Sequence, residues 1–140
     1  MPTIKQIKAK VIKQGGMFAA SPGKIYKILM DSKLHGKVTG DVAKISKKVG
    51  GAFSVFSGYA KGKNLVLVNG KKIVQSWRAS NWPKGAVSEI TFVLKKAKGG
   101  TKLMFTHKNV PAKFYKSISS GWKQYYWQPL KKFLEKSHKA

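Results

Sequence analysis

The segment KSISSGWKQYYWQPLKKFLEKS, residues 116–137, decides the fold of this chain. Its large apolar side chains recur at steps of four, three and one, which is the spacing of one face of an α-helix. They are Ile118, Trp122, Tyr125, Tyr126, Leu130, Phe133 and Leu134. Gly121 and Pro129 interrupt the pattern, and Pro129 should bend the helix because proline removes one backbone hydrogen bond.

So wide an aromatic face needs a large apolar partner, and the upstream strands can supply it. Hydrophobic periodicity predicts β-strands at residues 3–20, 42–49, 52–56, 64–68, 71–79, 87–96 and 101–109. Gly15-Gly16 should interrupt the first strand with a bulge or turn, and Gly58 and Gly62 should flank a reversal. Asn69-Gly70 predicts a hairpin with a type I′ turn. The alternative partner for the helix is a membrane surface.

Two short helices are expected between the first two strands. Ser21-Pro22 provides an N-cap and a first helical residue, and Asp31-Ser32 ends this helix and caps a second short one. This order of elements is an α+β layout. We expect one domain over residues 1–140 with a helix-grip fold, in which a curved antiparallel sheet of about six to seven strands wraps around the long C-terminal helix.

Charge is the unusual feature of the composition. The chain has 29 basic and 4 acidic residues, a net charge of +25, although its charged fraction of 24% is ordinary. Arg78 is the single arginine, whereas proteins that read nucleic acid rely on arginine and concentrate their charge in a patch. Lys24 stands at the third helical position, where glutamate is favoured. The surface therefore resembles one whose acidic positions were exchanged for lysine by deliberate supercharging, and the alternative is a naturally basic protein.

The sequence offers little for catalysis or metal binding. The four acids, Asp31, Asp41, Glu89 and Glu135, are far apart, and no cysteine is present. The three histidines lack metal-ligand spacing. We therefore expect no catalytic residue, no metal and no cofactor, and a hydrolase or cyclase would lack the polar groups that it needs.

No membrane span or signal peptide is expected. The four-residue apolar run Met17 to Ala20 is too short for the core of a signal peptide. No run approaches the length that a membrane span needs. The expected setting is therefore cytoplasmic.

A series of short motifs in a fixed order suggests a family. The motifs are Ala20-Ser21-Pro22, Gly50-Gly51-Ala52-Phe53, Lys72 to Arg78, Trp82-Pro83, Gly100-Thr101, Val110-Pro111 and Gly121-Trp122. From about Ala20 to Leu134 the chain resembles the activators of the ninety-kilodalton heat-shock chaperone's ATPase, in the START-like (SRPBCC) superfamily. The departures are mostly lysines at surface positions, namely Lys24, Lys27, Lys84, Lys95 and Lys113.

The resemblance implies a helix-grip fold that encloses an apolar cavity. It also implies a chaperone partner, since eukaryotic members carry such a domain behind a separate chaperone-binding domain. The 140 residues here resemble the second of these domains only. Chaperone activation is therefore an expectation at the level of the family.

The candidate cavity lining consists of Trp77, Phe92, Phe105, His107, Trp122 and Tyr126. If these side chains point inward, they surround an aromatic pocket for an apolar small molecule. The alternative is that they fill the space as plain core. His107 continues the strand face of Leu103 and Phe105, so it either reaches the cavity mouth or is a structural histidine bonded to backbone.

Arg78 and Glu89 form a candidate structural ion pair. If Pro83 centres a hairpin, the two residues face each other across neighbouring strands. Such a pair would explain why Arg78 and Glu89 were both retained when other surface positions became lysine.

Two functions of different classes remain open from the sequence. The first is a non-enzymatic START-like binding domain with an apolar cavity. The second is a cationic protein that binds polyanions such as nucleic acid, acidic proteins or anionic surfaces by non-specific electrostatics. In either case, like-charge repulsion should keep the chain monomeric at low salt.

Overall fold

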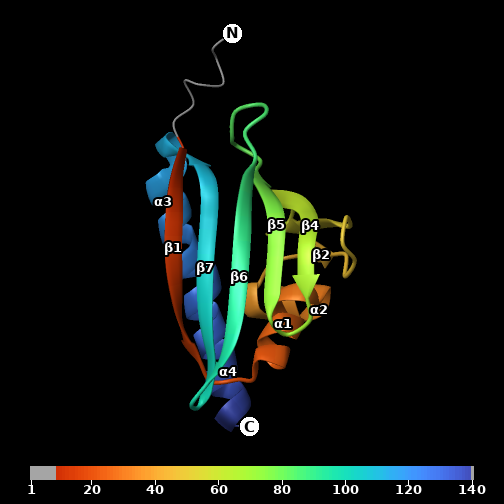
Figure 1. The fold of residues 1–140 in the computed structure, drawn as a ribbon, viewed down its shortest axis with the longest axis vertical. Helices are drawn as coiled ribbons and strands as arrows, with labels where there is room; N and C mark the ends of the chain where they lie inside the picture. Colours follow the sequence, from red (N-terminus) through yellow and green to blue (C-terminus); the bar gives the residue numbers. More distant parts are fainter. Residues whose placement is uncertain (1–8, 140) are drawn as a thin grey trace.

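The computed structural model describes residues 9–139 of the chain, and the side chains of residues 9–136. The expected strand residues 3–8 lie outside the described residues. Seven antiparallel strands form one sheet in the order β1-β7-β6-β5-β4-β3-β2 (Figure 1). The strands are β1 (Ala9–Phe18), β2 (Lys44–Ile45), β3 (Ala52–Val55), β4 (Ala60–Val68), β5 (Lys72–Ala79), β6 (Ser88–Ala97) and β7 (Gly100–Pro111).

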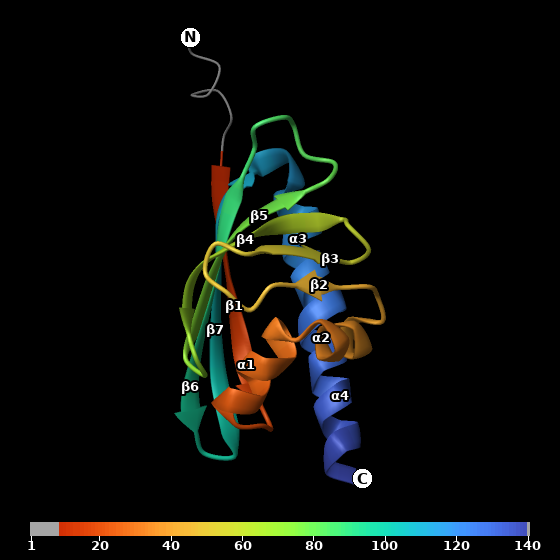
Figure 2. The same cartoon turned by 90° about the vertical axis from the view of Figure 1, so that its right-hand side faces the viewer.

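The helices all lie on one side of this sheet (Figure 2). They are α1 (Pro22–Met30), α2 (Ser32–Thr39), η2 (Ala112–Phe114), α3 (Tyr115–Trp122), η3 (Lys123–Trp127) and α4 (Gln128–Lys139). The last three run on as one rod along the sheet, while β3, β4 and β5 curve towards the rod. The expected helix-grip architecture is confirmed.

Side-chain caps define the two short helices, as the sequence predicts. The Ser21 Oγ accepts a hydrogen bond from the Lys24 backbone N–H (3.2 Å), and Pro22 occupies the first turn of α1. The Asp31 Oδ1 accepts one from the Leu34 N–H (3.0 Å) and caps α2. These bonds satisfy N–H groups that a helix start otherwise leaves without partners.

The first strand differs from its prediction. Gly15 and Gly16 pair regularly with Met104 and Leu103 on β7, so they do not interrupt β1. The register shift lies between Lys10 and Ile12 instead. The two glycines were therefore wrongly interpreted as a break in the strand.

Gly62 does not flank a reversal, because it lies inside β4. A Cβ at this position would stand 1.8 Å from the Ser76 carbonyl oxygen on β5. Only glycine allows the two backbones to approach so closely. The glycine therefore reflects close packing between strands.

The expected strand at residues 42–49 shrinks to the two residues of β2. The buried Asn64 side chain explains this, because its Nδ2 donates to the Ser46 carbonyl (2.7 Å) and to the Lys48 carbonyl (3.0 Å). Gln75 in turn donates to the Asn64 Oδ1 (2.9 Å). A side chain thus replaces a neighbouring strand as the partner of this segment.

The β4–β5 hairpin turns at Asn69-Gly70, as expected, but not with a type I′ turn. That turn needs positive φ at both residues, whereas only Gly70 has it (73°). Val68 pairs with Lys72, so the loop has three residues, and the Lys71 N–H donates to the Val68 carbonyl (2.9 Å). With Gly70 at the third position of this hydrogen-bonded turn, the pattern is that of a type II turn.

The C-terminal rod contains one wide turn that the helical spacing does not reveal. The segment η3 is a π-helix that ends just before Pro129, whose missing N–H could not continue the α-helical pattern. A step of five therefore places Trp127 next to Trp122 on the buried face. Tyr125, expected on that face, is instead half-exposed (52%).

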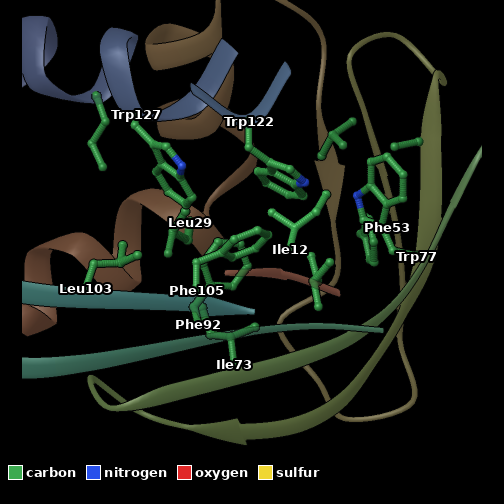
Figure 3. Close-up of a cluster of buried hydrophobic side chains, with 14 of the residues drawn as sticks. Ile12, Leu29, Phe53, Ile73, Trp77, Phe92, Leu103, Phe105, Trp122 and Trp127 are labelled. Atoms are coloured by element: carbon green, nitrogen blue, oxygen red, sulfur yellow. The ribbon is translucent and has the colours of Figure 1, made fainter. Parts of the chain in front are cut away.

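The core lies between the rod and the sheet. Trp122 and Trp127 point from the rod towards Phe92 and Phe105 on the strands (Figure 3). The centroids of the Phe105 and Trp122 rings are 4.3 Å apart. The buried rod face and the sheet are thus the apolar partners that the sequence predicts, and this excludes the alternative of a helix on a membrane surface.

Gln14 fixes the rod to β1. Its Nε2 donates to the Ser119 carbonyl (2.9 Å), and its Oε1 accepts a hydrogen bond from the Trp127 Nε1 (2.7 Å). One amide side chain thereby holds two points of the rod that lie about two helical turns apart. This contact spans more than 100 residues of sequence, and the sequence pattern does not predict it.

Candidate functional site

An open cleft of about 700 Å³ lies where the rod meets the curved end of the sheet. Six aromatic residues contribute to its walls: Phe56, Tyr59, Trp77, Trp122, Tyr125 and Tyr126. Its polar groups belong to Thr39, Asp41, Ser117, Ser120 and Gln124, and Ile118 and Gly121 complete the lining. Within residues 9–136, no basic residue lines the cleft.

The turn between β3 and β4 forms one wall of the cleft and has unusual backbone geometry. Phe56 and Ser57 both adopt positive φ, at 54° and 55°. Non-glycine residues rarely adopt this conformation, and it is strained for a bulky side chain. The Ser57 N–H donates to the Val42 carbonyl (2.9 Å), and the Ser57 hydroxyl donates to the Asp41 carboxylate. These two bonds hold the turn against the segment that follows α2.

Asp41 is the acidic group of the cleft. Its Oδ1 accepts hydrogen bonds from the Val42 N–H (3.1 Å) and from the Ser57 hydroxyl. Its other carboxylate oxygen forms no hydrogen bond within the described residues. The carboxylate is therefore held in place with one oxygen still able to accept a bond.

A second, much smaller cavity measures about 10 Å³, enough for roughly one water molecule. Trp77 and Tyr126 line both cavities and separate them. The Tyr126 hydroxyl is 2.8 Å from the His35 Nε2, while the His35 Nδ1 is buried without a hydrogen-bond partner among the described residues. Burial lowers the pKa of His35 to about 4 and raises that of Tyr126.

The six expected lining residues do not share one cavity. Trp77, Trp122 and Tyr126 line the cleft, and Phe92 lines only the smaller cavity. Phe105 and His107 line neither cavity. The aromatic residues between sheet and rod thus mainly fill the space, and the cleft lies at the edge of this cluster.

His107 is fully buried in a defined chain of hydrogen bonds. The Trp122 Nε1–H donates to the His107 Nδ1 (3.0 Å), and the His107 Nε2 lies 2.7 Å from the Ser88 Oγ. The Ser88 hydroxyl donates to the Trp77 carbonyl (2.8 Å). Burial lowers the pKa of His107 to about 3. His107 is therefore a structural histidine, bonded to side chains and not to backbone.

The Ser88–His107 contact resembles a catalytic pair in distance only. An indole nitrogen can only donate, so the His107 Nδ1 must be the acceptor, and the neutral ring carries its proton on Nε2. The ring therefore donates to Ser88 and cannot take the hydroxyl proton as a general base would. Ser88 is also buried.

The expected register around Arg78 is wrong. Glu89 pairs with Ser76 instead. The Arg78 guanidinium donates to the carbonyls of Pro83 (2.6 Å), Ala86 (2.8 Å) and Trp82 (2.9 Å). Within residues 9–136 the salt bridge that forms joins Lys47 to Asp31 (3.6 Å), so Arg78 and Glu89 are not a salt-bridged pair.

The positive charge covers the whole described surface. Every lysine from residue 9 to residue 136 is exposed, and these lysines occur on strands, helices and loops alike. In the described part of the chain, no three side chains of metal-binding type come together. Within residues 9–139, no helix has the length and hydrophobicity that a membrane crossing requires.

A curved antiparallel sheet that grips a C-terminal helix, with two short helices after the first strand, defines a START-like helix-grip domain. The chain belongs to the family described as Activator of Hsp90 ATPase homolog 1-like protein, whose pattern matches residues 19–135.

Curated relatives agree with this assignment. An uncharacterized protein of Schizosaccharomyces pombe is 34% identical over 120 residues, which cover 86% of this chain and 36% of the relative. The Activator of 90 kDa heat shock protein ATPase homolog of Dictyostelium discoideum is 31% identical over 125 residues, covering 88% of this chain and 31% of the relative. The chain thus spans about a third of the length of the curated relatives that it matches.

Two solved structures share the fold over nearly their whole length. The crystal structure of an HSP90 activator from Plasmodium falciparum has a TM-score of 0.80 at 26% identity, covering 91% of this chain and 96% of that one. The solution structure of the Aha1 dimer from Colwellia psychrerythraea has a TM-score of 0.77 at 26% identity, covering 90% and 96%.

Sequence reasoning missed half of the aromatic cleft wall. Phe56 and Tyr59 flank Ser57-Gly58, so they read as residues of a turn, and Tyr125 was assigned to the buried helix face. The closeness in sequence of Phe56 and Tyr59 to Gly58 was the available signal for an aromatic turn at the cleft. Nothing in the helical spacing indicated the π-helix that turns Tyr125 outward.

Proposed function

We propose that this protein is a non-enzymatic START-like binding domain whose cleft holds an apolar small molecule. The observation that carries the proposal is an open cleft of about 700 Å³ with six aromatic residues in its walls, within the size range of small-molecule sites. The direction of the Ser88–His107 hydrogen bond also favours binding over catalysis.

A helical glycine allows a direct test of this proposal. Gly121 lines the cleft, and an added Cβ would meet only the Tyr125 ring at 3.7 Å. Gly121→Leu should therefore fill the cleft with the fold intact. Gly23→Leu is the matched control, because Gly23 also lies in a helix with nothing within 4 Å of its Cβ position, away from the cleft.

The readout is the fluorescence of the neutral dye Nile red, titrated with each variant. Gly121→Leu should weaken binding by about tenfold or more, since a filled site loses the contacts of the whole dye, whereas Gly23→Leu should match the unmodified protein. Equal binding by both variants would refute the small-molecule site.

Family membership supports the ninety-kilodalton chaperone as the protein partner. The chain corresponds to about a third of the curated activators, so any stimulation of the chaperone's ATPase by this domain alone is part of the proposal. The test adds the purified chain to the purified chaperone and measures ATP hydrolysis. An unchanged hydrolysis rate at saturating chain would remove the chaperone from the proposal.

The second candidate function is non-specific binding of polyanions. It is favoured by the net charge of +25 and by the exposure of every described lysine. Binding to duplex DNA should show no sequence preference and should collapse between about 0.05 M and 0.5 M salt. The repulsion between two copies that both carry this positive charge supports a monomer at low salt. A sequence preference that survives high salt would contradict this reading.

We also infer that lysine replaced acidic residues on this surface, as in an engineered supercharged form. Two of the surviving acids support this view, since Asp31 and Asp41 accept structural hydrogen bonds that lysine could not accept. A naturally basic surface remains the alternative, and the cytoplasmic setting stays a prediction.

A further inference from the structure

We propose that the ligand of the cleft is a neutral, planar aromatic molecule with a hydroxyl or N–H group that donates to Asp41. This inference rests on the proposed function and adds the chemical class of the ligand. It follows from the shape, the charge and the hydrogen-bonding capacity of the cleft lining.

The aromatic side chains favour a flat ligand. Tyr59 and Tyr125 are 38% and 52% exposed, so these large rings remain accessible to a partner. Their neighbours hold them in place, with Tyr59 edge-on to Trp77 at 6.4 Å and Tyr125 edge-on to Phe56 at 6.0 Å. Aromatic pairs in stacked or edge-to-face geometry are favourable beyond the area that they bury. A planar aromatic ligand can make such contacts with several walls at once.

An anionic ligand does not fit this lining. Lysine and arginine make up 29 of the 140 residues, yet none of those in the described part of the chain lines the cleft. An anion inside would lose its hydration without gaining a cationic partner, and it would face the Asp41 carboxylate. The surface lysines attract anions to the whole protein, but they give an anion inside the cleft no direct ionic contact.

A cationic ligand does not fit either. Asp41 offers one negative charge, but the protein body carries +25. Lys116 and Lys123 are exposed and adjacent in sequence to the lining residues Ser117 and Trp122. At physiological salt the Debye length is about 8 Å, so this repulsion reaches the cleft. The repulsion from the exposed surface lysines, here called the lysine coat, therefore offsets the attraction of a cation to the Asp41 carboxylate.

A neutral hydrogen-bond donor suits the carboxylate oxygen of Asp41 that is still able to accept a bond. The Val42 N–H and the Ser57 hydroxyl fix its Oδ1, and the strained turn at Phe56 and Ser57 holds the serine in place. The free carboxylate oxygen can accept one hydrogen bond from a ligand. Hydrogen bonds to charged groups are stronger than neutral ones, so this contact sets the orientation of the ligand.

Four pyrene derivatives of one ring system test the proposal: 1-pyrenemethanol, its methyl ether, 1-pyrenecarboxylate and 1-pyrenemethylamine. Each is titrated by fluorescence into the protein, Gly121→Leu and Gly23→Leu at about 0.05 M and about 0.5 M NaCl. Binding to the cleft is the part that Gly121→Leu removes and Gly23→Leu retains. The part that both variants retain is attraction to the lysine coat.

In the cleft, 1-pyrenemethanol should bind tightest, with an affinity that changes less than about twofold with salt. Its methyl ether should bind about tenfold more weakly, because it lacks the donor. Asp41→Asn should shrink this difference, because the single amide oxygen is needed by the Val42 N–H and the Ser57 hydroxyl, and the NH2 group left for the ligand is a donor and not an acceptor.

The outcomes separate the inference from the function. An equal affinity of the methanol and its ether, or a charged derivative that binds the cleft tightest at high salt, would overturn the ligand class and leave the binding site standing. Binding of all four derivatives that ignores Gly121→Leu would overturn the small-molecule site itself.

Discussion

Lowering the pH from 7 to 5 should strongly destabilise this protein through two buried histidines. His107 and His35 are 0% and 3% exposed, and burial lowers their pKa values from 6.5 to about 3 and about 4. As the pH falls below 6.5, the unfolded chain takes up protons at both positions before the folded chain does. Their contribution to stability is therefore complete above pH 6.5 and is lost progressively towards pH 3 to 4.

The size of the effect follows from the linkage between protonation and folding. Each histidine that stays neutral in the folded state removes up to about 1.4 kcal/mol of stability per pH unit below 6.5. Between pH 7 and pH 5 this amounts to about 2 kcal/mol for each histidine and about 4 kcal/mol for both. Asp31 does not add to the loss of stability between pH 7 and pH 5, because the hydrogen bond from the Leu34 N–H lowers its carboxyl pKa below the ordinary value of 3.8.

Urea unfolding, followed by tryptophan fluorescence at constant salt, measures this loss. Urea is preferable to guanidinium, which is a salt and would screen the lysine coat. His107→Gln removes one of the two titrating groups, so it should roughly halve the dependence on pH even if it lowers the stability at pH 7. His35→Gln should do the same. A wild-type stability that stays flat from pH 7 to 5, or variants that keep the full slope, would refute the reasoning.

Three further substitutions, the first with a matched control, test separate parts of the fold. Arg78→Lys keeps the charge but loses the hydrogen bonds to the Pro83, Ala86 and Trp82 carbonyls, so it should lower the unfolding free energy by about 1–3 kcal/mol. The control Glu89→Gln should change the unfolding free energy little. A larger loss for Glu89→Gln than for Arg78→Lys would show that Glu89 forms a stabilising ion pair after all. Asn64→Leu leaves the Ser46 and Lys48 carbonyls without their donor and should lower it by about 2–4 kcal/mol in the same urea assay, an expectation that a loss below about 0.5 kcal/mol would contradict. Lys24→Glu completes a capping box at the start of α1 and should raise the melting temperature by about 2 °C. A lower melting temperature would count against the inference that lysine replaced an acidic residue at this position.

The parts of the fold that rest on local chemistry could be predicted from the sequence. Ser21 and Asp31 carry their own capping groups, so both short helices begin where the residues indicate. The alternating strands and the apolar face of the rod likewise follow from periodicity, because burial on one side leaves a repeating pattern. The motifs along the chain then led to the correct family.

The parts that depend on distant contacts could not be predicted. Gly62 looked like a turn residue because its close approach to Ser76 depends on the neighbouring strand. Asn64 shortens β2 through bonds across 16 to 18 residues. The π-helix shifts Tyr125 outward and creates the cleft wall, and helical spacing assumes a constant turn. The candidate site was therefore only half predicted.

The central claim is that the gripped helix leaves a cleft that binds a small molecule. The most direct measurement is a map of amide chemical shifts in the ¹⁵N-labelled protein during titration with 1-pyrenemethanol, whose ring current shifts nearby nuclei. The account predicts the largest changes at residues 56–59 and 117–126 and at the Trp77 indole N–H. Changes centred on β1 and the outer face of β7, or spread evenly over the exposed lysines, would contradict it.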